Sequence, residues 1–164
     1  MATINSLLVD ALKGNLGMLQ MTLADFSDAE MLVRPVPGAN HAAWQVGHLT
    51  VLENMVANLV SPGKVPPMPE GSNEKYGKKG ASNDEAAGFP SKKEVLDQFT
   101  QARTAIIDYI ATATPEDFDK PSPQGFEKWV PTMGRLFGEL AGHTAMHVGQ
   151  FQVLRRKLGK PVLF

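Results

Sequence analysis

Three histidines are the residues of this chain best suited to hold a metal ion: His48, and the pair His143 and His147, which lie four residues apart. Because an α-helix completes a turn in about 3.6 residues, side chains four apart lie on one face. Two imidazoles placed in this way could bind one ion, and His48 from a facing helix would supply a third nitrogen. A site with three protein ligands keeps one coordination position open, as catalytic zinc sites do. The pattern therefore predicts a metal centre that can accept a further ligand.

The alternative is that these histidines are core residues whose hydrogen bonds are satisfied by neighbouring side chains. Burying an unpaired imidazole costs about 1–3 kcal/mol, and either a metal or a hydrogen-bond partner would offset that cost. The expected position of all three histidines on inner helix faces favours the metal. The chain has no cysteine, which excludes disulfides, thiolate ligands and a cysteine nucleophile. An imidazole-only set suits Zn²⁺, Ni²⁺, Cu²⁺ or Fe²⁺, and among these divalent metals we expect zinc or nickel.

Two polar residues lie one helical turn from the histidine pair. Glu139 precedes His143 and could accept a hydrogen bond from an imidazole N–H, although a solvated glutamate is the commoner case. Gln150 follows His147 and could hydrogen-bond a metal-bound water or a polar substrate. Its ordinary alternative is a core amide bonded to a neighbouring helix. No residue of the chain is assigned a catalytic role on this basis.

Other charged or imidazole side chains have ordinary explanations. His41 lies two turns before His48, about 10 Å along a helix, so the two cannot share an ion, and we expect His41 on the surface at the helix start. Glu53 is rotated off the face of His48 and is expected to be exposed. Arg155 and Arg156 complement the negative end of a helix dipole.

The elements that must position these residues are four long helices. Periodic apolar residues predict them over about residues 4–24, 41–60, 91–113 and 132–158. Asn40, Ser91 and Thr132 are expected N-caps of the last three. The second helix is expected to bury a single stripe, composed of Trp44, His48, Val51, Leu52, Met55 and Leu59. With no credible strand, the prediction is an all-α, antiparallel four-helix bundle in which residues 1–164 form a single domain.

A long loop between the second and third helices is the other notable segment. Residues 61–90 are rich in Pro, Gly, Lys, Asn and Ser, and a loop of this length in a compact domain is usually functional or mobile. It is long enough for a crossover, so the bundle need not be simply up-and-down. We expect it to fold over the open metal position, with Trp44, Tyr76 and Trp129 as candidate pocket walls.

Composition gives no support for several classes of protein. The chain has 164 residues and a net charge of −1, so it has no basic field that would gather nucleic acid or anionic lipid. No apolar stretch reaches the roughly 20 residues that span a bilayer. The first residues lack the basic segment and apolar run of a secretory signal. We therefore expect a cytoplasmic protein with a small-molecule substrate and no nucleic-acid or membrane partner.

The motifs around the histidines resemble those of DinB-like (DinB/YfiT-like) proteins. The segment 44–49, Trp-Gln-Val-Gly-His-Leu, is similar to their motif around the first histidine. The segments 143–150 and 154–161 resemble their C-terminal signature. The resemblance covers essentially the whole chain, and the three-part motif is more specific than an HxxxH pair alone.

The resemblance implies a DinB-like four-helix bundle with a divalent metal on His48, His143 and His147, commonly as a homodimer. Relatives of this kind include bacillithiol S-transferases and mycothiol-dependent maleylpyruvate isomerase. The leading hypothesis is therefore a metal-dependent transferase or hydrolase, such as a thiol-dependent S-transferase that uses a low-molecular-weight thiol. The alternative function is a non-catalytic metal- or ligand-binding module that acts in a stress response.

Overall fold

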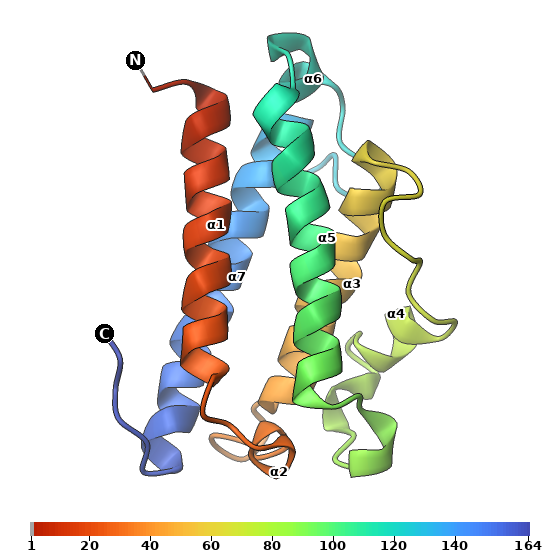
Figure 1. Ribbon diagram of the computed structural model, residues 1–164. Helices are drawn as coiled ribbons and strands as arrows, with labels where there is room; N and C mark the ends of the chain where they lie inside the picture. Colours follow the sequence, from red (N-terminus) through yellow and green to blue (C-terminus); the bar gives the residue numbers. More distant parts are fainter. Residues whose placement is uncertain (1) are drawn as a thin grey trace.

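The computed structural model describes residues 2–164, and helices dominate this part of the chain (Figure 1). The four long helices are α1 (Ile4–Leu23), α3 (Ala42–Val60), α5 (Lys92–Thr112) and α7 (Met133–Lys157). The shorter ones are α2 (Asp28–Met31), α4 (Ser72–Lys75), η1 (Gly80–Ser82), η2 (Ala86–Gly88) and α6 (Pro115–Asp119). Residues 2–164 contain no strand, only an isolated bridge between Pro121 and Thr132. The all-α prediction is confirmed.

The four long helices lie side by side, and their directions differ from the simplest expectation. In Figure 1, α1 and α7 run downward, whereas α3 and α5 run upward. Helix α1 contacts α5 and α7, and α3 contacts the same two helices. The expected antiparallel arrangement therefore holds for α1 with α5 and for α3 with α7, but it is wrong for α3 with α5 and for α1 with α7. The long connection between α3 and α5 allows this, because it returns the chain to the lower end before α5 begins.

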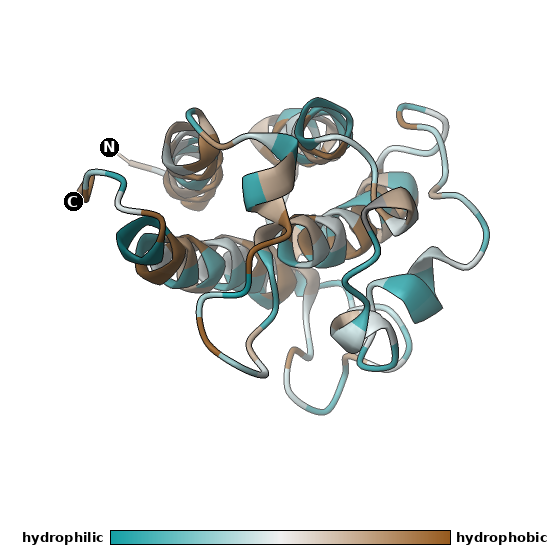
Figure 2. Ribbon diagram, turned by 90° about the horizontal axis from the view of Figure 1, so that it is seen from below, coloured by the Kyte–Doolittle hydropathy of each residue, from teal (hydrophilic) through white to brown (hydrophobic). Residues whose placement is uncertain are grey.

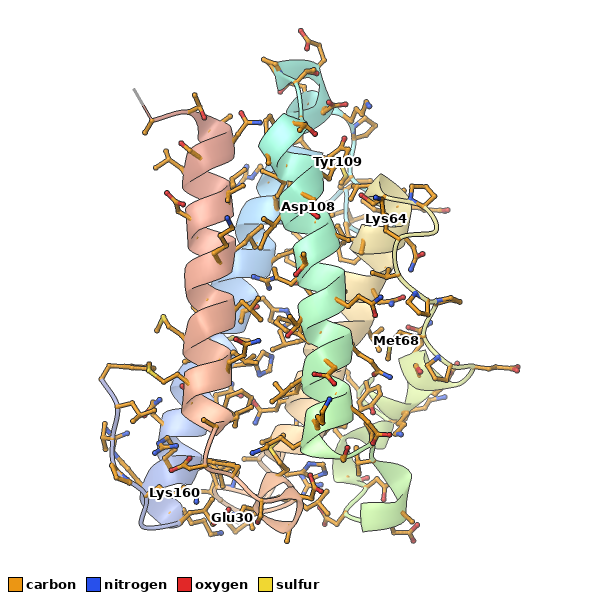
Figure 3. All side chains as sticks on the ribbon, viewed as in Figure 1. Glu30, Lys64, Met68, Asp108, Tyr109 and Lys160 are labelled. Atoms are coloured by element: carbon orange, nitrogen blue, oxygen red, sulfur yellow. The ribbon has the colours of Figure 1, made fainter. Side chains whose placement is uncertain are left out.

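This connection, residues 61–91, is called the crossover segment below. It contains the hydrophilic helix α4, which Figure 2 shows outside the four long helices. Arg34 ties the segment down, donating hydrogen bonds to the Asp84 carboxylate at 2.7 Å and to the Ala81 carbonyl at 2.8 Å. In Figure 3, Lys64 and Met68 lie on its stretch beside α3. In the part of the chain described, no helix is both long and apolar enough to cross a membrane.

Helix α3 begins at a cap that the sequence did not predict. Ser91 and Thr132 cap α5 and α7 as expected, but His41, and not Asn40, caps α3. The His41 Nδ1 accepts a hydrogen bond from the Trp44 backbone N–H at 3.1 Å, and its Nε2 donates to the Asn83 carbonyl at 2.9 Å. The expectation of a surface histidine is wrong, because the crossover segment encloses the ring completely.

A buried ion pair joins all four long helices. Arg103 of α5 donates to Glu53 of α3 through two nitrogens, at 2.9 and 2.5 Å. The same guanidinium donates to the Leu12 carbonyl of α1 at 3.3 Å and to the Thr144 hydroxyl of α7 at 2.7 Å. Glu53 is only 1% exposed and Arg103 is fully buried, so the expectation of an exposed Glu53 is wrong.

The single buried stripe expected for α3 is also only partly correct. Met55 and Leu59 are 39% and 51% exposed, whereas Glu53, Val56 and Ala57 are buried. The reason is that α5, α7 and the crossover segment cover α3 from several directions. A prediction that assumes one buried stripe therefore assigns the buried face of α3 to the wrong residues.

The lower end of the bundle is closed by charged side chains of α7 and the C-terminal segment. Arg155 is 2% exposed and donates to the Asp25 carboxylate at 2.6 Å and to the Thr22 carbonyl at 2.8 Å. Lys160 lies 3.1 Å from Glu30, and both are labelled in Figure 3. Arg155 therefore anchors α7 to the end of α1, in addition to any effect on the helix dipole, while Arg156 is exposed.

Candidate metal centre

The fold brings the three predicted histidines together. His48 comes from α3, and His143 and His147 come from α7. One ligand nitrogen of each lies within 4.8 Å of the others, and the Nε2 atoms of His143 and His147 are 3.2 Å apart. His147 is buried and the other two are half-buried. The group is therefore compact enough for one ion and still open toward the outside.

Hydrogen bonds set the tautomers of two of these rings. The His48 Nδ1 lies 3.1 Å from the Tyr76 carbonyl oxygen. The His147 Nδ1 lies 2.7 Å from the Gln45 side-chain oxygen. Since both oxygens only accept hydrogen bonds, each Nδ1 must carry the proton, which leaves the Nε2 lone pair free. This is the arrangement that orients metal-binding imidazoles in proteins.

Gln45 is itself held in one orientation. Its amide nitrogen donates to the Asn40 carbonyl at 2.6 Å. A carbonyl cannot donate, so the amide oxygen must face His147. Gln45 is buried, and this hydrogen-bond chain connects the loop before α3 to the metal-facing ring of α7.

Trp44 holds the ring of His48 from behind. The two rings are stacked, with centroids 5.0 Å apart and planes inclined by 6°. The indole N–H donates to the Lys75 carbonyl at the end of α4, at 3.1 Å. Trp44 is therefore a buried support of His48, as its place on the same stripe suggested, and it lies outside the lining of the adjoining cavity.

Tyr76 is positioned by a glycine next to His48. A Cβ added to Gly47 would lie 2.0 Å from the Tyr76 Cε1, so the ring packs directly on the backbone of α3. Burial raises the pKa of the Tyr76 phenol to about 12. The close contact seats the crossover segment on α3 and so places the carbonyl that accepts the hydrogen bond of His48.

The environment keeps the histidine pair neutral. Burial, followed by the charges of His143 and His48, lowers the pKa of His147 to about 3. Burial, followed by the charges of His48 and Arg103, lowers the pKa of His143 to about 4. A metal binds the neutral imidazole, so both rings are ready to bind at neutral pH without losing a proton.

Glu139 and Gln150 differ in their relation to the histidine pair, because a hydrogen bond with the Gln150 side chain acts on His147 and raises the pKa of that ring against the effect of burial. Both are exposed. Within residues 2–164, Glu139 has no hydrogen bond to an imidazole, but it lines a cavity together with His48 and His143. Gln150 lies at a different surface pocket, beside Gln45, so the prediction that it is a core amide is wrong.

Sequence reasoning missed two supports of the centre, Gln45 and the Tyr76 carbonyl. Gln45 carries a signal, since it is a polar residue in an apolar segment, one turn before His48. A backbone carbonyl carries none, because every residue has one.

Comparison with known families agrees with the site geometry. The family model of the DinB superfamily matches residues 11–151, most of the chain, and this range contains all three histidines. A comparison with curated proteins finds no match.

Proposed function

The chain belongs to the DinB superfamily, and from this premise we propose that it binds a divalent metal through His48, His143 and His147. One observation carries the proposal: a ligand nitrogen of each of the three histidines lies within 4.8 Å of the others, and the hydrogen bonds on the Nδ1 atoms of His48 and His147 leave their Nε2 atoms without a proton. Three neutral imidazoles fit zinc or nickel. The donor set contains no carboxylate or thiolate, so it leaves the full charge of the ion to act on a further ligand.

We further propose that the protein is a metal-dependent enzyme, with transfer to or from a small-molecule thiol as the leading reaction. When bound, the metal would lower the pKa of a thiol or water at its open position and so supply a nucleophile. The chain has no cysteine, so any thiolate must come from a second small molecule. The chain's own part is to fix the three rings, for which the Tyr76 carbonyl in the crossover segment orients His48 and Gln45 orients His147. A cavity beside His48 and His143 gives a second small molecule room next to the proposed metal, as this reaction requires.

Metal analysis of protein purified without a histidine tag tests the metal site. We expect one zinc or nickel ion per chain in the wild type and a large loss of affinity in His143→Ala. The matched control is Gln101→Ala, which truncates an exposed polar side chain of α5 outside the site. Absence of bound metal in wild-type protein supplied with zinc and nickel, or unchanged affinity in His143→Ala, would overturn the proposal.

A substrate screen separates an enzyme from a binding module. Zinc-loaded and nickel-loaded protein would be incubated with several cellular thiols and electrophiles, and thioether products would be measured. The proposed mechanism requires that turnover disappears in His48→Ala. Turnover that survives this substitution would refute it, and metal binding without any turnover would favour the non-catalytic module.

Two further expectations remain predictions, a homodimer and a cytoplasmic location. For the homodimer, the outer side of α7 offers the exposed apolar residues Met146 and Val153, which are 52% and 47% exposed. Sedimentation of the wild type and of Met146→Glu would test whether this face joins two copies.

A further inference from the structure

A cavity of 420 Å³ adjoins the three histidines, and His48 and His143 form part of its wall. It is called the chamber below. It lies between α3, the crossover segment, the connection before α7, and α7 itself. Its volume is in the range that holds small organic ligands. The chamber therefore lies where a ligand could reach the histidine nitrogens.

Apolar side chains form most of the remaining wall: Val51, Leu52, Met55, Phe126, Trp129 and Leu136. Met55 is 39% and Trp129 is 57% exposed, and the rings of Phe126 and Trp129 lie 6.0 Å apart. Large apolar side chains gathered in a hollow and left open to water are typical of a ligand site. The apolar pattern of α3 predicts that Met55 is buried. An apolar ligand in the chamber would cover the exposed Met55 side chain.

The chamber has one charged wall residue, Glu139 of α7. Among the described residues no cation pairs with its carboxylate. Three kinds of neutral polar group complete the wall: the two histidine rings, the Tyr76 phenol and the amide of Asn73. The part of a ligand that lies in the chamber, away from the histidines, therefore contacts apolar surface and one negative charge. If that part carried a carboxylate, no wall residue would neutralise it.

We propose that the chamber binds a small molecule with an uncharged, apolar body, preferably aromatic, and a single ionisable head group directed at the histidines. Glu139 acts as a specificity residue that rejects ligands whose body carries a further negative charge, because like charges in a partly desolvated site repel. This inference rests on the proposed function for the head group, whereas the body site is a property of the chamber alone.

Two thiols test the selectivity on zinc-loaded protein: phenylmethanethiol, which has an apolar aromatic body, and 3-sulfanylpropanoate, which carries a carboxylate. Dissociation constants would be measured from the fluorescence of Trp129. The variant Trp129→Phe retains only the emission of the buried Trp44 and so shows how much of the signal comes from Trp44. We expect phenylmethanethiol to bind about tenfold more tightly or better. Glu139→Gln should reduce the difference by strengthening the anionic thiol alone. Equal binding of both thiols, or an unchanged ratio in Glu139→Gln, would overturn the selectivity.

A matched pair of variants tests the location. Met55→Glu places a charge in the chamber wall, whereas Leu59→Glu places one a turn later on α3, at a residue that is 51% exposed and outside the wall. Both substitutions are at exposed positions, so both variants should fold. We expect phenylmethanethiol to bind about tenfold more weakly to Met55→Glu and normally to Leu59→Glu. Equal effects of the two substitutions would overturn the location.

Phenylmethanol and metal-free protein separate this inference from the metal proposal. If the chamber binds the aromatic body, phenylmethanol should change the Trp129 fluorescence without metal, and Met55→Glu should abolish the change. If this response is seen and the protein also fails to bind zinc when zinc is supplied, the metal proposal is refuted and the chamber inference is supported. Zinc binding with no response to either aromatic probe would overturn the chamber inference alone.

Discussion

Replacing Gln45 by leucine should weaken metal binding, although Gln45 is not itself a ligand. The substitution removes the amide oxygen that lies 2.7 Å from the His147 Nδ1 and accepts its hydrogen bond. It leaves the volume of the side chain nearly unchanged. The ring would then be free to rotate or to move its proton to Nε2, the nitrogen that faces the other histidines.

The magnitude follows from the burial of this hydrogen bond. Gln45 is 2% and His147 is 5% exposed, so water cannot easily replace the lost acceptor. A buried N–H without a partner costs about 1–3 kcal/mol, and about 1.4 kcal/mol corresponds to a factor of ten in affinity. Loss of comparable partners of metal-binding histidines lowers affinity by about 10–100-fold. We therefore expect the dissociation constant for zinc to rise by about 10–100-fold.

Competition with a chromophoric zinc chelator, on protein without a tag, measures this change. Gln101→Leu is the matched control, because Gln101 is an exposed glutamine on α5, and it should bind zinc like the wild type. Gln45→Glu keeps an acceptor oxygen for His147 but loses the N–H that donates to the Asn40 carbonyl, so it should recover only part of the affinity that Gln45→Leu loses. If Gln45→Leu is folded and binds zinc as tightly as Gln101→Leu, the reasoning about the tautomer of His147 is wrong.

Three other perturbations give separate tests. Arg103→Met should lower the free energy of unfolding by about 3–5 kcal/mol, because it leaves Glu53 buried without its partner. A change below about 1 kcal/mol in urea unfolding would contradict a stabilising role of the buried ion pair. Gly47→Ala should displace the aromatic ring packed on it, since the added carbon would lie 2.0 Å away, and zinc titration should show weaker binding; unchanged binding would mean that the crossover segment does not support the site. In metal-free protein, the free energy of unfolding should fall as the pH drops from 6.5 toward about 4. The reason is that the pKa values of His143 and His147 are lowered to about 4 and about 3 in the folded protein, so these histidines take up protons at a higher pH in the unfolded chain. Denaturant unfolding at a series of pH values should show a loss of up to about 1.4 kcal/mol in the free energy of unfolding per pH unit for each histidine. An equally steep loss in the variant in which both histidines are replaced by alanine would contradict this assignment.

The sequence predicts the four long helices well because their main determinants are local. Apolar periodicity marks each helix, and capping residues such as Ser91 and Thr132 mark where two of them begin. The histidine pair is predicted for the same reason, because its spacing within one helix decides which face it shares. Only His48 required a tertiary inference, namely that α3 and α7 face one another, and the structure bears this out.

The residues that the sequence misplaces depend on contacts between distant segments. Glu53 reads as exposed because its partner, Arg103, lies on another helix and shows no local sign of burial. His41 reads as a surface residue because the crossover segment that encloses it is irregular and polar. The directions of α3 and α5 likewise depend on the path of that segment, which no periodic pattern specifies.

The central claim is that three imidazole Nε2 atoms hold one metal ion beside the chamber. A crystal structure of zinc-loaded protein without a tag, with anomalous scattering measured at the zinc edge, tests this most directly. We predict one anomalous peak per chain, about 2.0–2.1 Å from the Nε2 atoms of His48, His143 and His147, with the remaining ligand of the ion on the side of the chamber. No peak at the triad, or a zinc ion bound elsewhere on the chain, would contradict it.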